Sequence, residues 1–166
     1  LSNVTALDAG RGHNCAIVGA GGVKCWGLGR DGQLGNGLAA DSSVPVDVQG
    51  ITNASAITAG WEQSCALLVT GAVKCWGHGP LGNDSAAASS SPVDVQGITD
   101  ATPISSGGAY GPRHSCAVLG TGRVKCWGDN IGGQLGNGST VTSLVPVEVQ
   151  GITTAVGVSA GGSHTC

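Results

Sequence analysis

The chain repeats one motif of fifteen residues: HNCAIVGAGGVKCWG at 13–27, QSCALLVTGAVKCWG at 63–77 and HSCAVLGTGRVKCWG at 114–128. Each copy holds two short apolar runs joined by a glycine-rich turn, which is the pattern of a β-hairpin. A period of about 50 residues indicates stacked units, each of which buries its faces against its neighbours. The motif therefore predicts a repeat architecture built from strands.

Further segments recur at the same period outside this motif. They are GQLGNG at 32–37 and 133–138, PLGND at 80–84, VPVDVQGIT at 44–52, SPVDVQGIT at 91–99 and VPVEVQGIT at 145–153. We expect four strands in each unit, and in the first unit they fall near Val4–Ala9, His13–Val18, Val23–Gly27 and Val44–Gln49. Four short strands per 40–50 residues are typical of propeller blades.

The sequence therefore predicts an all-β fold, a partial β-propeller of about three four-stranded blades with one blade incomplete. Residues 1–166 form a single propeller segment, with repeats at about 1–50, 51–101 and 102–151 and the start of a fourth at 152–166. The second unit is three residues shorter between Trp76 and Gly97 than the first is between Trp26 and Gly50, and it gains residues around Gly107–Pro112. Both changes fall in predicted loops.

The composition excludes two classes of partner. Acidic residues number 10 and basic residues 7, so the net charge is −3 and there is no basic surface for nucleic acid. No apolar run approaches the roughly 18 residues that a membrane span needs, so we expect no membrane insertion. Phe and Met are absent, and the core must therefore be built from Val, Ile, Leu, Ala, Cys and four Trp.

The pattern AGxxHxCA, VKCWG, GQLGNG and PV resembles the regulator of chromosome condensation repeat family, in the cysteine-bearing form of bacterial secreted proteins. The resemblance covers the whole chain and implies a seven-bladed propeller of four-stranded blades. Seven blades of about 50 residues need roughly 350 residues. We therefore expect an excerpt of a longer chain; a ring completed by other copies and an open arc are the alternatives.

The cysteines are expected to form one disulfide within each hairpin. In an antiparallel hairpin with Cys15 opposite Cys25, the Cα atoms of a non-hydrogen-bonded pair lie about 4.5 Å apart, within disulfide range. The same register holds for the other two hairpins, so the predicted pairs are Cys15–Cys25, Cys65–Cys75 and Cys116–Cys126. Disulfides indicate an oxidising compartment, so we expect the protein to be extracellular or secreted. A location at the cell surface is the alternative within this prediction.

Cys166 has the register of a first cysteine but no partner ten residues later, so we expect it to be unpaired. The H-x-C pairs at His13, His114 and His164 could suggest zinc, but they lie in different units and each paired Cys has a partner across its hairpin. We therefore expect no metal site and no cofactor. Each histidine is expected to hydrogen-bond the backbone of a neighbouring loop.

The tryptophans fall into two groups. Trp26, Trp76 and Trp127 recur with the repeat, which favours packing between blades over a carbohydrate-binding row. Trp61 does not recur: it lies in a loop where the first unit has Arg11 and the third has an insertion. Because binding residues on propellers concentrate in loops, the candidate contact loop comprises Trp61, Glu62, Tyr110 and Arg113.

No catalytic residues are predicted, because the chain has no nucleophile elbow, no HExxH motif and no paired carboxylates in one loop. The predicted function is a non-catalytic extracellular scaffold or protein-interaction module, with a protein partner or self-association. The alternatives are a self-assembling filament or surface-layer component and a protein inhibitor that binds an enzyme through loops of one face. Glycan attachment in a glycosylating host is predicted at four sequons, Asn3, Asn53, Asn83 and Asn137.

Overall fold

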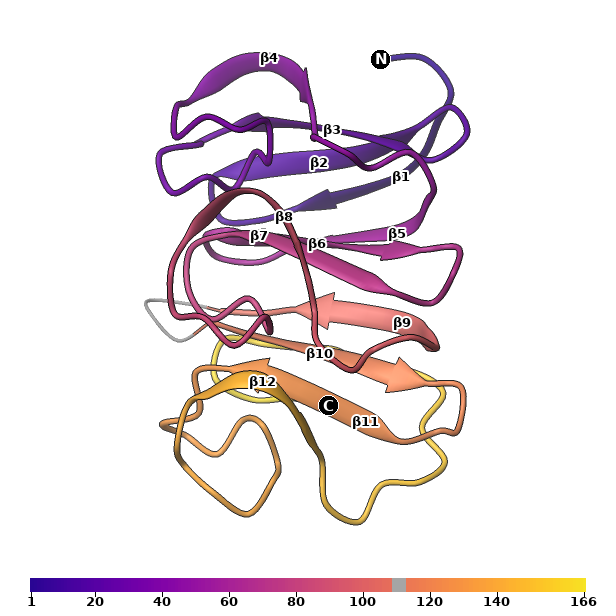
Figure 1. Cartoon of the computed structure of the whole chain (residues 1–166), viewed down its shortest axis with the longest axis vertical. Coiled ribbons are helices and arrows are strands. Elements are labelled where there is room, and N and C mark those ends of the chain that lie inside the picture. The colour runs from indigo at the N-terminus through magenta and orange to yellow at the C-terminus, as the bar shows by residue number, and fades with distance from the viewer. Residues whose placement is uncertain (109–112) are drawn as a thin grey trace.

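The structure is a computed structural model that describes residues 1–108 and 113–166 (Figure 1). Its strands form three antiparallel sheets of four, in the orders β1-β2-β3-β4, β5-β6-β7-β8 and β9-β10-β11-β12. The described residues contain no helix, and hence none long and apolar enough to cross a membrane. The strands are β1 Val4–Ala9, β2 His13–Val18, β3 Gly22–Gly27, β4 Ser42–Asp47, β5 Ala54–Ala59, β6 Gln63–Leu68, β7 Val73–Gly77, β8 Ser89–Asp94, β9 Ala101–Ser106, β10 His114–Leu119, β11 Val124–Gly128 and β12 Ser143–Glu148.

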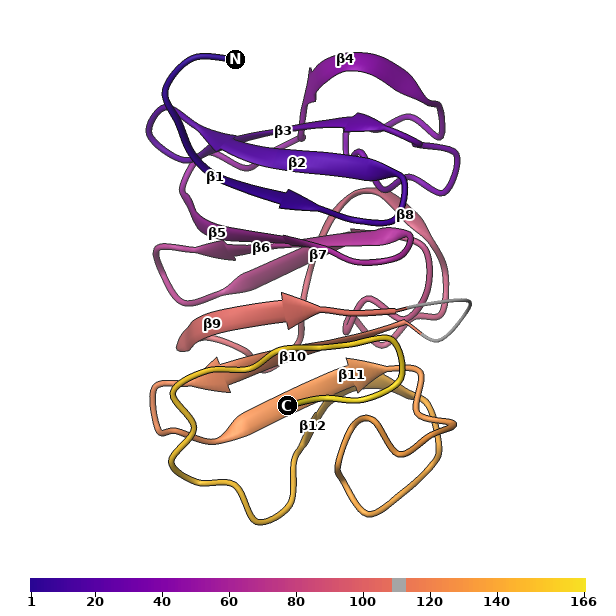
Figure 2. The ribbon, with the colours of Figure 1, turned by 180° about the vertical axis from the view of Figure 1, so that it is seen from behind.

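The three sheets lie one after another in chain order (Figure 1), and buried side chains of neighbouring sheets pack together between them. Seen from behind, residues 152–166 lie over the outer face of the third sheet (Figure 2). Three stacked sheets of four antiparallel strands are the architecture of a partial β-propeller, so the predicted fold class is confirmed.

In the first sheet, the strand bounds agree with the sequence patterns except at β3, which begins at Gly22 rather than Val23, and at the fourth strand, β4. β1 and β2 have the predicted ends, whereas β4 begins at Ser42 rather than Val44 and ends at Asp47 rather than Gln49. Ser42 pairs with Gly27 of β3, which starts the strand earlier. The backbone N–H of Gln49 donates to the carbonyl of Gly35 over 2.9 Å, which draws the chain away from the sheet.

The hydrophobic core lies between the sheets rather than inside any one of them. The first layer joins Val23 and Leu34 of the first unit to Ala66 and Trp76 of the second, and the second layer is its equivalent around Trp127. Trp76 and Trp127 are fully buried, while Trp26 is half-buried. The prediction that these recurring tryptophans pack between blades is confirmed for Trp76 and Trp127.

Neighbouring sheets are also tied together along their first strands. The carboxylate of Asp8 accepts a hydrogen bond from the backbone N–H of Ala59 over 2.8 Å. The hydroxyl of Thr58 accepts from the N–H of Ser106 over 2.9 Å, and that of Ser105 accepts from Ala160 over 3.0 Å. The third bond shows that residues after 152 continue the stacking arrangement.

Each hairpin has the predicted register. Cys15 lies opposite Cys25, Ile17 opposite Val23 and Val18 opposite Gly22. The two cysteines of each hairpin have their Cα atoms 4.1 Å apart and form a disulfide, which gives Cys15–Cys25, Cys65–Cys75 and Cys116–Cys126. Cys166 is free and exposed.

Candidate functional site

The connections from first to second strand of the three sheets all leave the same end of the stack. The described residues of these segments are 10–12, 60–62, 107–108 and 113, and they lie between β1 and β2, between β5 and β6, and between β9 and β10. Because strands alternate in direction, the longer connections from third to fourth strand begin at this end too. Residues that do not recur between units are therefore brought side by side here.

We call the boundary between two neighbouring sheets a seam. The first seam, between the sheets β1–β4 and β5–β8, contains a stacked Arg–Trp pair. The guanidinium carbon of Arg11 lies 3.9 Å from the centroid of the Trp61 ring, a cation–π geometry. Arg11 is exposed and Trp61 half-buried. A hollow of about 430 Å³ lies on one side of this stack, between the glycine-containing turns that follow the first strands of the sheets. A second hollow, of about 110 Å³, lies on the other side, next to Leu28 and Asp31. The stack is thus the common wall of two surface hollows.

The second seam carries an ion pair between two sheets. Nε of Arg113 lies 3.1 Å from Oε2 of Glu62, and a terminal nitrogen of the same guanidinium also contacts this oxygen. Nδ1 of His78 lies 3.7 Å from the same oxygen. Glu62 and Arg113 are half-buried, so the pair fixes the position of the two loops relative to each other.

We call Arg11, Trp61, Glu62 and Arg113 the loop row. Three of these were predicted from the sequence, and the structure brings Glu62 and Arg113 into contact. Tyr110 lies outside the described residues. Arg11 was missed as a member, although its position in the repeat is that of Trp61. A pair of unlike residues at equivalent positions of adjacent units was the signal that could have identified it.

The buried histidines belong to the seams between sheets and not to the loop row. Nε2 of His13 lies 2.8 Å from the hydroxyl of Ser64, which itself donates to the carbonyl of Gln33 over 3.0 Å. His13 is therefore the donor to Ser64. The prediction that His13 hydrogen-bonds a loop backbone was wrong. Its ring donates a hydrogen bond to a side-chain hydroxyl on the next sheet, because stacking places β6 beside it.

Burial controls the protonation of these histidines. Desolvation lowers the pKa of His13 from 6.5 to about 4, against the opposing effect of the Asp8 carboxylate. Burial also lowers the pKa of His114, whose Nε2 lies 2.9 Å from the hydroxyl of Thr165. Both rings are neutral near neutral pH and act as hydrogen-bond donors inside the seams.

The structure also locates the residues that were considered for metal binding and for glycosylation. In residues 1–108 and 113–166, no group of three His, Cys, Asp or Glu side chains could hold a metal ion. Asn3 is exposed, and Asn53, Asn83 and Asn137 are half-buried. Their glycosylation stays a prediction.

Comparison with known families gives a match over more than half of the chain. The model of the Regulator of chromosome condensation (RCC1) repeat matches residues 20–67 and 121–166, and a second model of this repeat matches residues 4–33.

Sequence relatives include two different kinds of protein. The ultraviolet-B receptor UVR8 of Arabidopsis thaliana is 33% identical over 98% of this chain, and the match spans 38% of the receptor. The human E3 ubiquitin-protein ligase HERC2 is 42% identical over 34% of this chain and 1% of its own length. The chain thus spans well under half the length of these relatives.

Solved structures share the arrangement of sheets. Prp20p from Saccharomyces cerevisiae, described together with its binding to Gsp1p and histones, superposes with a TM-score of 0.82 at 22% identity, over 99% of this chain and 43% of Prp20p. Yeast RCC1 (Prp20) bound to Kap60 gives a TM-score of 0.84 at the same identity, over 99% and 42%. At this identity the likeness shows the fold alone.

Proposed function

Since the chain belongs to the regulator of chromosome condensation (RCC1) repeat family, we propose that it is a non-catalytic protein-interaction module that binds its partner through the loop row. The proposal is supported by Prp20p, a protein of the same fold that is described with its binding to Gsp1p and histones and bound to Kap60. Which partner this chain binds does not follow from those proteins.

The observation that carries the proposal is the Arg11–Trp61 stack. Arg and Trp are among the residues that contribute most to protein–protein binding when they are held in place and ringed by other contacts. Here the half-buried indole of Trp61 stacks on Arg11 of the neighbouring sheet and lies between two hollows. The Glu62–Arg113 pair holds the adjoining loops. A partner would thus meet a preorganised surface, which limits the entropy lost on binding.

The whole propeller is proposed to be larger than this chain. Three sheets and the beginning of a further one correspond to 43% of Prp20p, which is in line with about seven sheets in a closed ring. The three disulfides support an oxidising, extracellular setting, because such bonds persist there and are rare in the cytosol. Mass analysis of protein taken directly from its source, without reduction, tests this setting: more than one free thiol would contradict it.

The binding proposal is tested by capture from the extracellular fluid of the source organism. Trp61→Ala and Arg11→Ala are expected to lower the amount of captured partner at least about tenfold, as loss of a central aromatic or Arg contact does. Val69→Ala is the control, since Val69 is 70% exposed in the turn at the opposite end of the sheets. Undiminished capture by both loop-row variants, folded by circular dichroism, would remove this surface from consideration.

The two alternative functions stay predictions. An inhibitor would bind its target enzyme through the same loop row, so Trp61→Ala and Arg11→Ala would lower that binding too. A filament or surface-layer component would instead show a concentration-dependent increase in light scattering, and the loop-row variants would leave it unchanged.

A further inference from the structure

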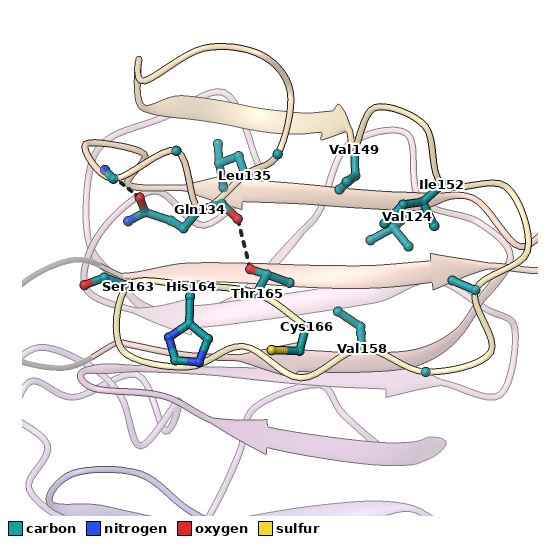
Figure 3. A pocket seen from close by; sticks show the side chains of 15 residues that line it. Val124, Gln134, Leu135, Val149, Ile152, Val158, Ser163, His164, Thr165 and Cys166 are labelled. Atoms are coloured by element: carbon teal, nitrogen blue, oxygen red, sulfur yellow. Dashed lines mark hydrogen bonds between the residues drawn. The ribbon is translucent and has the colours of Figure 1, made fainter.

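The glutamines of the two GQLGNG segments use only one end of their side chains to hold their own loops. Oε1 of Gln33 accepts a hydrogen bond from the backbone N–H of Asp31 over 2.9 Å. Oε1 of Gln134 accepts one from the N–H of Gly132 over 2.9 Å, which Figure 3 shows as a dashed line at Gln134. Nε2 of neither side chain donates to any residue that the structure describes. Each loop therefore contains an amide donor that its own hydrogen bonds do not use.

The surroundings of these two donors differ. Nε2 of Gln134 is fully enclosed. Gln33 instead lines the hollow of about 110 Å³ beside the Arg11–Trp61 stack, which lies between the segments 11–12, 28–33 and 61–62 and which we call the first-seam hollow. Gln33 is only 2% exposed, but its Nε2 is not fully enclosed, so this donor is accessible from the hollow.

Two further polar groups of the lining are available for hydrogen bonds. The guanidinium of Arg11 stacks on Trp61 but makes no hydrogen bond or ion pair within residues 1–108 and 113–166. The carboxylate of Asp31, a half-buried residue, makes none with those residues either. The other charged residues of the lining are already in ion pairs, Arg30 with Asp41 and Glu62 with Arg113. The hollow thus combines donors with an acceptor, and the charges of its lining balance.

The rest of the lining includes two apolar side chains that are held in place. The indole of Trp61 is fixed by the stack, and Leu28 packs on Gly12, where a Cβ atom would lie 2.5 Å from Cδ1 of Leu28. Leu28 is 47% exposed, so part of it can contact a partner. Apolar walls with a few fixed polar groups are typical of binding pockets. A matching occupant has a short apolar stem and an uncharged polar end that both donates and accepts hydrogen bonds.

We propose that the first-seam hollow binds a glutamine side chain of the partner protein, an inference that rests on the proposed role of the loop row. The carboxamide oxygen of that glutamine accepts hydrogen bonds from Nε2 of Gln33 and from Arg11, and its nitrogen donates to the carboxylate of Asp31. Its two methylene groups lie against Leu28 and Trp61. A glutamate would bring a second carboxylate to Asp31, and a lysine would bring a second cation to Arg11. The hollow therefore selects against both charges.

The test uses the whole chain and three compounds, the N-acetyl N′-methylamides of glutamine, glutamate and lysine. Binding at neutral pH is followed by the NMR signals of the Gln33 side-chain amide. The glutamine compound is expected to shift these signals saturably, with a dissociation constant in the millimolar range. The other two are expected to bind at least about tenfold more weakly, because each leaves a polar group of the hollow unpaired and meets a like charge. Equal binding of all three, or no saturable shift with the glutamine compound, would overturn the proposal.

Chain variants test the assigned hydrogen bonds one at a time. Gln33→Glu keeps an oxygen for the N–H of Asp31 but replaces the amide donor with an acceptor, and it is expected to abolish binding of the glutamine compound, followed in this variant by the Trp61 indole signal. Gln134→Glu makes the same change outside the hollow and is expected to leave this binding unchanged. Asp31→Asn removes the facing carboxylate and is expected to raise binding of the glutamate compound at least about fivefold. Unchanged binding of the glutamate compound to that variant, folded by circular dichroism, would contradict the role given to Asp31.

Capture of the partner separates this inference from the proposed function. Both Trp61→Ala and Gln33→Glu are expected to lower the amount captured from the extracellular fluid. Loss with Trp61→Ala but undiminished capture with Gln33→Glu would overturn the glutamine inference and leave the loop row as the binding surface. Undiminished capture with Trp61→Ala and Arg11→Ala would instead overturn the proposed function itself, whatever the three compounds show.

Discussion

At the scale of single residues, one position of the repeat demands a hydrogen-bond donor and not a particular side chain. His13 and His114 occupy it in the first and third units, and Gln63 in the second. Nε2 of Gln63 donates to the hydroxyl of Ser115 over 2.8 Å, as Nε2 of His13 does to Ser64. The difference is that only the histidine titrates, so the two side chains are equivalent at neutral pH and differ in acid.

Acid is therefore expected to weaken the seam at His13. The pKa of this histidine is 6.5 when unfolded and about 4 when folded, so between these values the unfolded chain binds more protons and stability falls as the pH falls. The loss on going from pH 7 to pH 4 amounts to about 3 kcal/mol. Urea unfolding at each pH measures it, and His13→Gln should show a loss smaller by this amount.

A second variant distinguishes the effect of this histidine from a general effect of acid on the stability of the fold. Gln63→His introduces a titrating ring into the equivalent buried site of the second unit, where Gln63 is 1% exposed. It should make the unfolding free energy more dependent on pH. If neither variant changes that dependence, the seam histidines do not govern it.

At the scale of the hairpin, the last residue of the third strand must be glycine. Gly77 has φ +104°, and a Cβ atom there would lie 2.3 Å from the carbonyl oxygen of Glu62, the residue just before the partner strand β6. Gly27 and Gly128 have the same conformation and the same contact with their own hairpins. The recurring CWG motif thus combines a packing residue with a close backbone approach.

Gly77→Ala is expected to lower the free energy of unfolding by at least about 3 kcal/mol, since backbone strain and a clash with backbone atoms add. Gly50→Ala is the matched comparison: its φ is +67°, and a Cβ atom there meets nothing within 4 Å. That variant should lose only about 1 kcal/mol, the cost of a left-handed conformation. Urea unfolding followed by tryptophan fluorescence measures both, and equal losses would refute the role given to the close approach.

At the scale of the whole molecule, the sheets are held together by unequal seams. Trp76 and Trp127 are equally buried, yet Nε1 of Trp76 donates to the carbonyl of Gln33 while Nε1 of Trp127 has no partner among the described residues. The second unit has Pro80 in place of Gln33 and a loop three residues shorter. The seam formed by this shorter loop thus contains a buried donor that has no partner among the described residues.

Trp76→Phe is accordingly expected to cost more than Trp127→Phe. Both remove part of a ring from the core, but only the first removes a hydrogen bond, and the second removes an unsatisfied donor. The difference in unfolding free energy should be about 1–2 kcal/mol. Thermal or urea unfolding of the two variants in parallel measures it, and a larger loss for Trp127→Phe would contradict this account.

Most of the fold could be predicted because its signals are local. The spacing of Cys15 and Cys25 and the glycine turn between them set the hairpin register, which the structure confirms at Ile17–Val23. Recurrence of the motif then predicts stacked sheets. Trp61, Glu62 and Arg113 could be selected because they break the repeat.

The contacts across the seams were decided by the tertiary structure alone. Hairpin register depends on neighbours a few residues apart, whereas the Ser64 hydroxyl reaches His13, and Arg11 reaches Trp61, across about one repeat of sequence. Which atoms face each other there depends on the distance and rotation between two sheets. Packing of bulky side chains such as Trp76 sets both quantities, and no local pattern encodes them.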